Sequence, residues 1–242
     1  PSEKSHEYLL NAGVSKQVEV IPNPVDVDEF SIERVDIDEI NNLKAKYNIP
    51  ENAFVGCVIT RIGREKSIDI LLRYIKKYIS KNDNFYFVIV GDGPSKNELM
   101  QLADEIKISD KVIFTGKVPN QDLLPYYAMS DVFLTASLSD TNSISMLEAM
   151  SMGLPIIQRY DEINKDQIIE GQNGFTFSGS KEFIQKLDLI YNMSKQEREQ
   201  LRNRVRNCVI QKNSQLATAQ KVYNVYKKAI YKKRVKRRKL YK

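Results

Sequence analysis

The sequence predicts an α/β fold, a Rossmann-like doubly wound parallel sheet with helices on both faces, followed by further helices toward the C-terminus. Two observations predict it. Short apolar runs alternate with longer stretches of helical periodicity between residues 53 and 158. The runs lack polar alternation, as FVIV at 87–90 and FLTA at 133–136 illustrate. Strands of this kind are buried on both faces of a sheet, as a parallel sheet between helices requires.

The elements of this body follow in order. Strands are expected at 53–60, 85–91, 111–116, 131–137 and 155–158, with the last closing the series, and helical patterns at 67–80, 96–108, 122–130 and 143–152. Ahead of the body, the sequence predicts a short helix at 2–13, a strand running into a turn at 18–26 and a charged helix at 37–48. Beyond residue 180 it predicts three helices, the third from about residue 214.

Composition removes several classes of function. Two cysteines, Cys57 and Cys208, are too few for a disulfide scaffold and indicate a reducing compartment. A single histidine, His6, argues against a histidine-rich metal site or a local Ser-His-Asp arrangement. No window approaches the roughly 20 apolar residues of a membrane span. We therefore expect a soluble protein, and its first residue, Pro1, suggests a chain that begins partway through a longer protein.

The formal net charge of +6 belongs to one end of the chain. Residues 227–242 contain ten Lys or Arg and no acid, so the other 27 cations face 31 acids, a balance of −4. This distribution disfavours a basic body that binds nucleic acid across a face. The tail itself allows three interpretations: a solvated end, attraction to an anionic membrane surface, and RNA binding, for which it offers no aromatic platform.

Two turns after strands carry candidate chemistry. In the first, Arg61 and Lys66 precede a helix, where they either clamp a diphosphate or belong to a solvated loop. In the second, GDGPS at 91–95 suggests dinucleotide binding, but Lys96 stands where the third glycine of GxGxxG belongs. We interpret this segment as a tight turn.

The segment 137–155 is the most informative. Asp140 lies in the turn after a strand, and a helix opening at Ser143 would direct the backbone N–H groups of 143–145 toward an anion. Glu148 would then accept hydrogen bonds from a ribose diol. Capping roles for Asp140 or Ser143, and a solvated Glu148, are the alternatives. The apolar neighbours of Glu148 are a poor environment for an unpaired charge.

From residue 1 to about 178 the chain resembles the C-terminal, donor-binding half of the B-type fold in family 4 (group 1) of the retaining nucleotide-sugar glycosyltransferases. The resemblance rests on six motifs in order. They are IPNPVDVDEF at 21–30, the Arg61 to Asp69 turn, GDGP at 91–94, IFTGKV at 113–118, the acid-x7-Glu pair Asp140 and Glu148, and Asn164, Lys165, Asp166, Ile168, Gly171, Asn173 and Gly174.

The resemblance implies a role for each matching residue. Arg61 and Lys66 would bind the donor diphosphate, and Asp140 would contact hydroxyls of the transferred sugar, so these three are the catalytic candidates. Glu148 would hold the ribose. The other donor contacts would come from backbone, with Ser143, Ile144 and Ser145 at the β-phosphate and Lys117 and Val118 at the base. Thr141 stands where many members have glycine.

The implied architecture has three parts. Residues 1–50 are the end of an N-terminal domain or linker with the first elements of this domain, 51–178 the nucleotide-sugar-binding Rossmann-like domain, and 179–242 C-terminal helices with a polybasic tail. The partner that the resemblance implies is a missing N-terminal, acceptor-binding domain of the same protein. The stripe Val222, Val225, Tyr226, Ala229 and Ile230 either docks there or packs in the core.

The expected function is a retaining, metal-independent transfer of a hexose from a nucleotide-sugar, foremost a UDP-sugar, to a surface polysaccharide, glycolipid or glycoprotein. No cofactor or metal is expected, because the pairs Asp26/Asp28 and Asp36/Asp38 have DxD spacing without the apolar strand that precedes such a motif. The expected location is cytoplasmic, with peripheral attachment at the inner face of the plasma membrane through 227–242. The alternative is a catalytically inactive nucleotide-sugar-binding or scaffold module.

Overall fold

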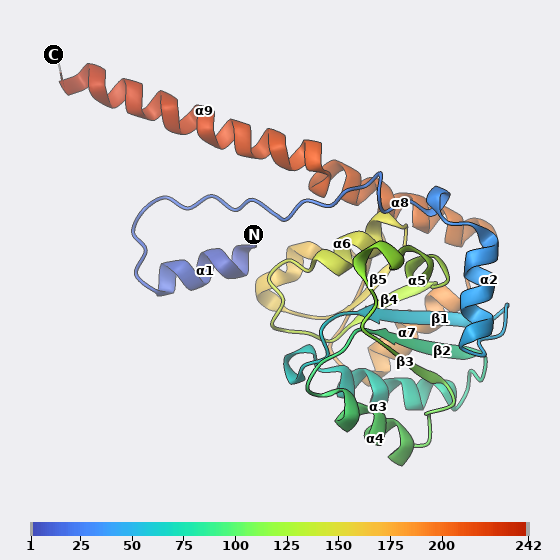
Figure 1. Ribbon diagram of the computed structural model, residues 1–242. Coiled ribbons are helices and arrows are strands. Elements are labelled where there is room, and N and C mark those ends of the chain that lie inside the picture. Colours follow the sequence, from blue (N-terminus) through green and yellow to red (C-terminus); the bar gives the residue numbers. More distant parts are fainter. Residues whose placement is uncertain (1, 241–242) are drawn as a thin grey trace.

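A parallel β-sheet forms the centre of the computed structural model, which describes residues 2–240 and, in its C-terminal helix, side chains as far as residue 233 (Figure 1). Within those residues the sheet has six strands in the order β3-β2-β1-β4-β5-β6, all parallel. The strands are β1 (Phe54–Ile59), β2 (Phe85–Val90), β3 (Val112–Gly116), β4 (Val132–Thr135), β5 (Ile156–Arg159) and β6 (Gly174–Phe177). The predicted doubly wound fold is confirmed.

Helices that present an apolar side to the sheet cover both of its faces (Figure 1). In α3 (Ile68–Ile79), for example, Leu71, Leu72 and Ile75 recur at helical spacing and are fully buried. The helices are α1 (Glu3–Asn11), α2 (Ile37–Lys46), α3 (Ile68–Ile79), α4 (Lys96–Glu105), α5 (Leu124–Ala128), α6 (Ile144–Ser151), α7 (Ser180–Tyr191), α8 (Lys195–Asn213) and α9 (Gln215–Leu240), with 3₁₀ turns η1 (Ile32–Arg34), η2 (Arg64–Lys66), η3 (Asn120–Asp122) and η4 (Glu162–Gln167).

The strand order locates the place where a ligand fits. From β1 the chain proceeds outward to β2 and β3, returns to the other side of β1 as β4, and continues to β5 and β6. The direction therefore reverses between β1 and β4, whose register pairs Gly56 with Val132 and Cys57 with Phe133. In doubly wound sheets the crevice outside the carboxyl ends of the strands at this point is the ligand site.

Two sequence predictions about strands are wrong. The strand at 155–158 does not close the series, because β6 follows at Gly174–Phe177 and pairs with β5. A Cβ on Gly174 would lie 2.2 Å from the carbonyl oxygen of Ile156, so this edge needs glycine. The segment 18–26 is extended but joins no sheet. Its Val25 forms an isolated bridge with Ser214 instead.

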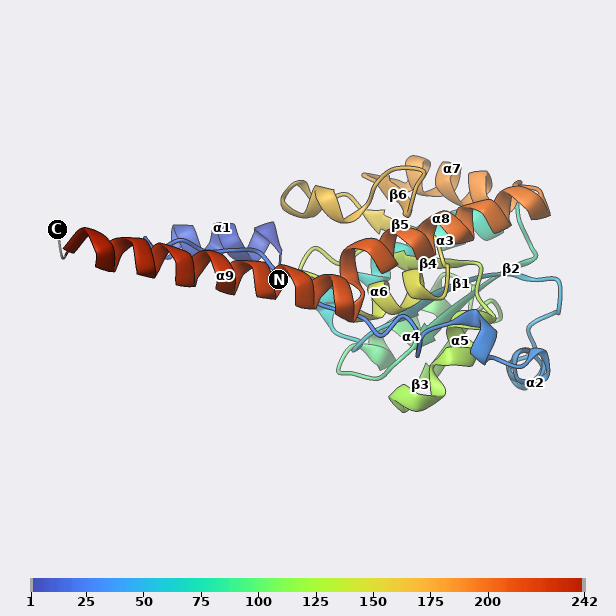
Figure 2. The same cartoon turned by 90° about the horizontal axis from the view of Figure 1, so that it is seen from above.

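The two ends of the described chain lie on the same side of the sheet domain. In both views α9 extends away from the sheet, and α1 lies on the side of the domain toward which α9 extends (Figure 1, Figure 2). The arm between α1 and η1 (residues 12–31) touches α9, since Lys232 Nζ donates to Gln17 Oε1 at 2.6 Å. Tyr226, Ala229 and Ile230 are exposed, so this part of the α9 stripe does not pack in the core. Among the helices described here, none is both long and apolar enough to cross a membrane.

Candidate functional site

Two loops meet at the carboxyl ends of β1 and β4. Lys66 ends η2 in the turn after β1, and its Nζ forms an ion pair with Asp140 Oδ1 at 2.5 Å. The carbonyl of Glu65 in the same turn accepts 3.4 Å hydrogen bonds from the hydroxyls of Ser137 and Ser139 after β4. The structure thus brings together two predicted residues that are 74 positions apart in the sequence.

Arg61 lies in the same turn and is largely exposed. Its guanidinium forms an ion pair with Glu65 Oε1 at 2.5 Å. Both predicted cations are therefore neutralised by carboxylates of this chain. An exposed pair contributes little to stability, so Arg61 is available to a ligand that offers stronger acceptors.

Ser143 begins α6 and caps it. Its side chain accepts a hydrogen bond from the N–H of Met146 at 3.4 Å, which confirms the capping alternative for Ser143. Asp140 does not cap, because its carboxylate is paired with Lys66. Among residues 2–240 no acceptor is found for the five consecutive N–H groups from Thr141 to Ser145. This row of donors at a helix N-terminus suits an anion.

Glu148 is 7% exposed, so the solvated alternative for it is wrong. The hydroxyl of Tyr127 donates a 2.7 Å hydrogen bond to Glu148 Oε2. Burial raises the pKa of Glu148 above its ordinary value, the Tyr127 hydrogen bond opposes that rise, and the charge of Glu29 adds to it. Tyr127 was missed from the sequence, because one tyrosine in the apolar run of 122–130 carries no signal of its own.

Lys117 and Val118 follow β3, two strands away from β1. Lys117 is exposed and Val118 half-buried, and both line a hollow of about 600 Å³ with Tyr47 and Tyr126. Tyr126 precedes the residue that holds Glu148, so α5 links this hollow to α6. No ion pair or hydrogen bond joins Lys117 or Val118 to the Lys66–Asp140 pair among the residues described.

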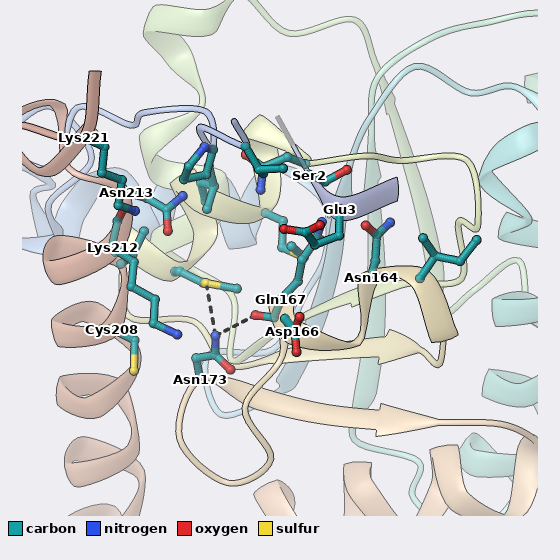
Figure 3. A pocket seen from close by; sticks show the side chains of 18 residues that line it. Ser2, Glu3, Asn164, Asp166, Gln167, Asn173, Cys208, Lys212, Asn213 and Lys221 are labelled. Carbon is teal, nitrogen blue, oxygen red and sulfur yellow. Dashed lines mark hydrogen bonds between the residues drawn. The ribbon is translucent and has the colours of Figure 1, made fainter. Parts of the chain in front are cut away.

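A separate cavity of about 240 Å³ lies on the other side of α6 (Figure 3). Met146 and Met150 line it, and successive helix residues are about 100° apart, so Glu148 faces away from it. Residues of α8, η4 and the N-terminal arm also line this cavity, and none of Arg61, Lys66, Asp140 or Glu148 does. The donor candidates therefore form a different site.

Carboxylates with DxD spacing act as loop and cap residues, as predicted. Asp26 accepts from the N–H groups of Asp28 and Glu29, and Asp36 caps α2 by accepting from the N–H of Asp38. Within the described part of the chain, no group of three or more His, Cys, Asp or Glu is placed to hold a metal ion.

Comparison with known proteins gives one family match. The family model described as "Glycosyl transferases group 1" matches residues 39–208. The alpha-monoglucosyldiacylglycerol synthase of Acholeplasma laidlawii is 31% identical over 187 residues, which are 77% of this chain and 47% of that protein. The chain thus spans about half the length of this relative.

Solved structures share the fold. A glycosyltransferase from Rickettsia africae superposes with a TM-score of 0.82 at 20% identity, over 95% of this chain and 62% of that one. Anabaena HepE in complex with UDP-glucose superposes with a TM-score of 0.79 at 18% identity, over 94% and 62% of the two chains. At this identity the likeness concerns the fold.

Proposed function

The chain belongs to the group 1 glycosyl transferases, and on that premise we propose that it is the donor-binding half of a retaining, metal-independent glycosyltransferase. The donor is a nucleotide-sugar, foremost a UDP-sugar, and the transferred group is a hexose. A structural neighbour that binds UDP-glucose supports this choice of donor. The remaining length found in the relatives would hold the acceptor.

One observation carries the proposal. At the point where the strand order reverses, the Lys66–Asp140 pair lies beside the row of unpaired N–H groups that opens α6. A nucleoside diphosphate sugar offers matching groups: a diphosphate for Arg61, Lys66 and the N–H row, and hydroxyls for Asp140. Glu148, held by Tyr127, would take the ribose diol.

Donor binding then exchanges partners. The diphosphate draws Arg61 from Glu65 and Lys66 from Asp140, which frees the Asp140 carboxylate to accept from the sugar. When the glycosyl–phosphate bond breaks, negative charge grows on the leaving diphosphate, and the cations and N–H groups stabilise it. Arg61 and Lys66 supply the positive charge that a divalent cation supplies in metal-dependent enzymes, which is why we propose metal independence.

The acceptor is proposed to be a glycolipid or another surface glycan, at the cytoplasmic face of a membrane. Two observations support a lipid surface. The named product of one relative, monoglucosyldiacylglycerol, is a lipid, and residues 227–242 carry ten Lys or Arg without an acid. Each such charge contributes about 1 kcal/mol near an anionic membrane.

The test is calorimetric titration of the chain with UDP, GDP and ADP and with their sugar conjugates. We expect one nucleotide to bind, and Arg61→Ala and Glu148→Ala each to weaken it by about tenfold or more. Arg64→Ala is the matched control, because Arg64 lies in the same turn and is exposed beside Glu98. No binding of any nucleotide at millimolar concentration would contradict the proposal.

Turnover separates an enzyme from an inactive binding module. In the longer protein that includes the acceptor half, Asp140→Ala is expected to abolish most of the sugar transfer while nucleotide affinity changes little. Transfer that survives Asp140→Ala unaltered would remove the sugar-contact role. Nucleotide binding by a wild-type protein that transfers no sugar to any surface acceptor would favour the module.

A further inference from the structure

Three consecutive backbone carbonyls in the loop that carries Asp140 each accept a hydrogen bond from a side-chain amide. Asn164 Nδ2 donates to the carbonyl of Asp140 at 2.7 Å, and Gln167 Nε2 to that of Thr141 at 2.6 Å. Asn23 Nδ2 donates to the carbonyl of Asn142 at 2.8 Å. We name Asn23, Asn164 and Gln167 the amide clamp. Two of its members stand on η4, where Figure 3 labels them, and one on the N-terminal arm.

The clamp is built into the fold. Asn164 is 6% exposed, and its amide nitrogen also contacts Asp161 Oδ2 at 3.2 Å. Asn23 makes two further hydrogen bonds: its N–H donates to Asn142 Oδ1 of the loop at 2.8 Å, and its carbonyl accepts from Asn213 of α8 at 3.1 Å. Residues held in this way can determine the position of a loop, because their own positions are restricted.

The clamp also sets the direction of the loop's donors. The C=O and N–H of a trans peptide unit point to opposite sides, and no peptide bond described here is cis. Because the carbonyls of residues 140, 141 and 142 face the clamp, the N–H groups of residues 141, 142 and 143 point away from it. These are the first three of the five N–H groups without an acceptor among residues 2–240. A run of such donors is a site for the oxygens of a ligand.

We propose that Asn23, Asn164 and Gln167 are positioning residues for the donor sugar. By holding the three carbonyls, they present Asp140 and the N–H groups of 141–143 to the sugar and its β-phosphate. The inference rests on the proposed function. It also accounts for Thr141 where many family members have glycine, since the clamp holds this loop without a positive φ at 141–143.

The experiment compares three ligands, UMP, UDP and UDP-glucose, by calorimetric titration of the chain. Gln167→Met keeps the side-chain length and removes the donor, and Asn164→Asp keeps the shape and replaces the donating nitrogen with oxygen. Gln101→Met is the control, because Gln101 is exposed on α4 and donates its hydrogen bond to Glu105 of the same helix. UMP lacks both the β-phosphate and the transferred glucose, so its affinity reports on the contacts to the base, the ribose and the α-phosphate.

We expect both clamp variants to lose about tenfold or more in affinity for UDP-glucose, less for UDP, and under about twofold for UMP. Gln101→Met should leave all three affinities unchanged. Equal losses for UMP and UDP-glucose, or unchanged affinity for UDP-glucose, would overturn the clamp. Gln167 is half-buried, so Gln167→Met keeps the test valid where Asn164→Asp does not fold. Wild-type protein that binds none of the three ligands, nor the GDP and ADP series, contradicts the proposed function itself.

Discussion

Glu148 connects the titration of one carboxyl to donor binding. Its pKa is raised, chiefly by burial, and the Tyr127 hydroxyl opposes that rise by favouring the ionised form. Ribose hydroxyls need the ionised form as an acceptor. As pH falls through the raised pKa the acceptor is lost, so nucleotide affinity should decline at a higher pH than an ordinary glutamate would give. Tyr127→Phe removes the opposing hydrogen bond and should move the decline to still higher pH.

Nucleotide titrations between about pH 5 and about pH 8 measure this shift. Tyr74→Phe serves as the control, since Tyr74 of α3 packs against Phe177 of β6 and Phe183 of α7, not against α5 or α6 residues that hold Glu148. A Tyr127→Phe protein whose affinity declines at the same pH as the wild type would show that the hydroxyl does not tune Glu148.

At this scale the sequence indicates residue types better than partners. Spacing and resemblance selected Lys66, Asp140 and Glu148, and all three lie at the β1–β4 reversal or on the helix behind it. Their partners depend on packing between distant segments. Tyr127 reaches Glu148 across 21 residues and Asn23 reaches Asn142 across 119, and no local pattern encodes such contacts.

At the scale of elements, one arginine of α8 joins this helix to both the arm and α6. The guanidinium of Arg206 donates to the carbonyls of Val27 at 2.9 Å and Phe30 at 3.0 Å, and also to that of Ser151. Ser151 ends α6, where carbonyls lack helical partners. The arm, α6 and α8 are thereby joined at one point.

Arg206→Met keeps most of the aliphatic packing and removes these hydrogen bonds. Because the donor is charged and the carbonyls are partly buried, we expect a loss of about 2 kcal/mol in the free energy of unfolding, measured by urea denaturation. Arg204→Met, exposed on the same helix, should change it by less than about 0.5 kcal/mol. Similar losses in the two variants would contradict this role of Arg206.

The elements also separate what periodicity can and cannot predict. The continuous runs of β1, β2 and β4 were found because burial on both faces requires apolar residues throughout. The four-residue GFTF of β6 was missed, since glycine and threonine weaken its pattern. The segment 18–26 resembled a strand, yet its Val25 and Asn23 form hydrogen bonds with the end of α8 and with the Asp140 loop.

For the whole molecule, the charge distribution leads to a membrane test. Deleting residues 227–242 removes ten cations, so we expect binding to vesicles that contain anionic lipid to fall by about tenfold or more at low salt. Co-sedimentation measures it, with phosphatidylcholine vesicles as the uncharged comparison. Replacing four exposed lysines of α9 together by Gln should give an intermediate loss of vesicle binding. These are Lys227, Lys228, Lys232 and Lys233. Equal binding of full-length and shortened chains would contradict the membrane proposal.

The exposed tyrosines of α9 give the chain an optical reporter. The protein has no tryptophan, so its intrinsic emission comes from tyrosine, 13 residues in all. Tyr223, Tyr226 and Tyr231 stand exposed on α9, whereas Tyr78 and Tyr127 are fully buried. A soluble quencher such as acrylamide therefore reaches the emission of α9 readily and that of the interior poorly. If another part of the protein or a lipid surface covers this helix, its tyrosines are protected from the quencher. The reduced quenching can be measured without any label.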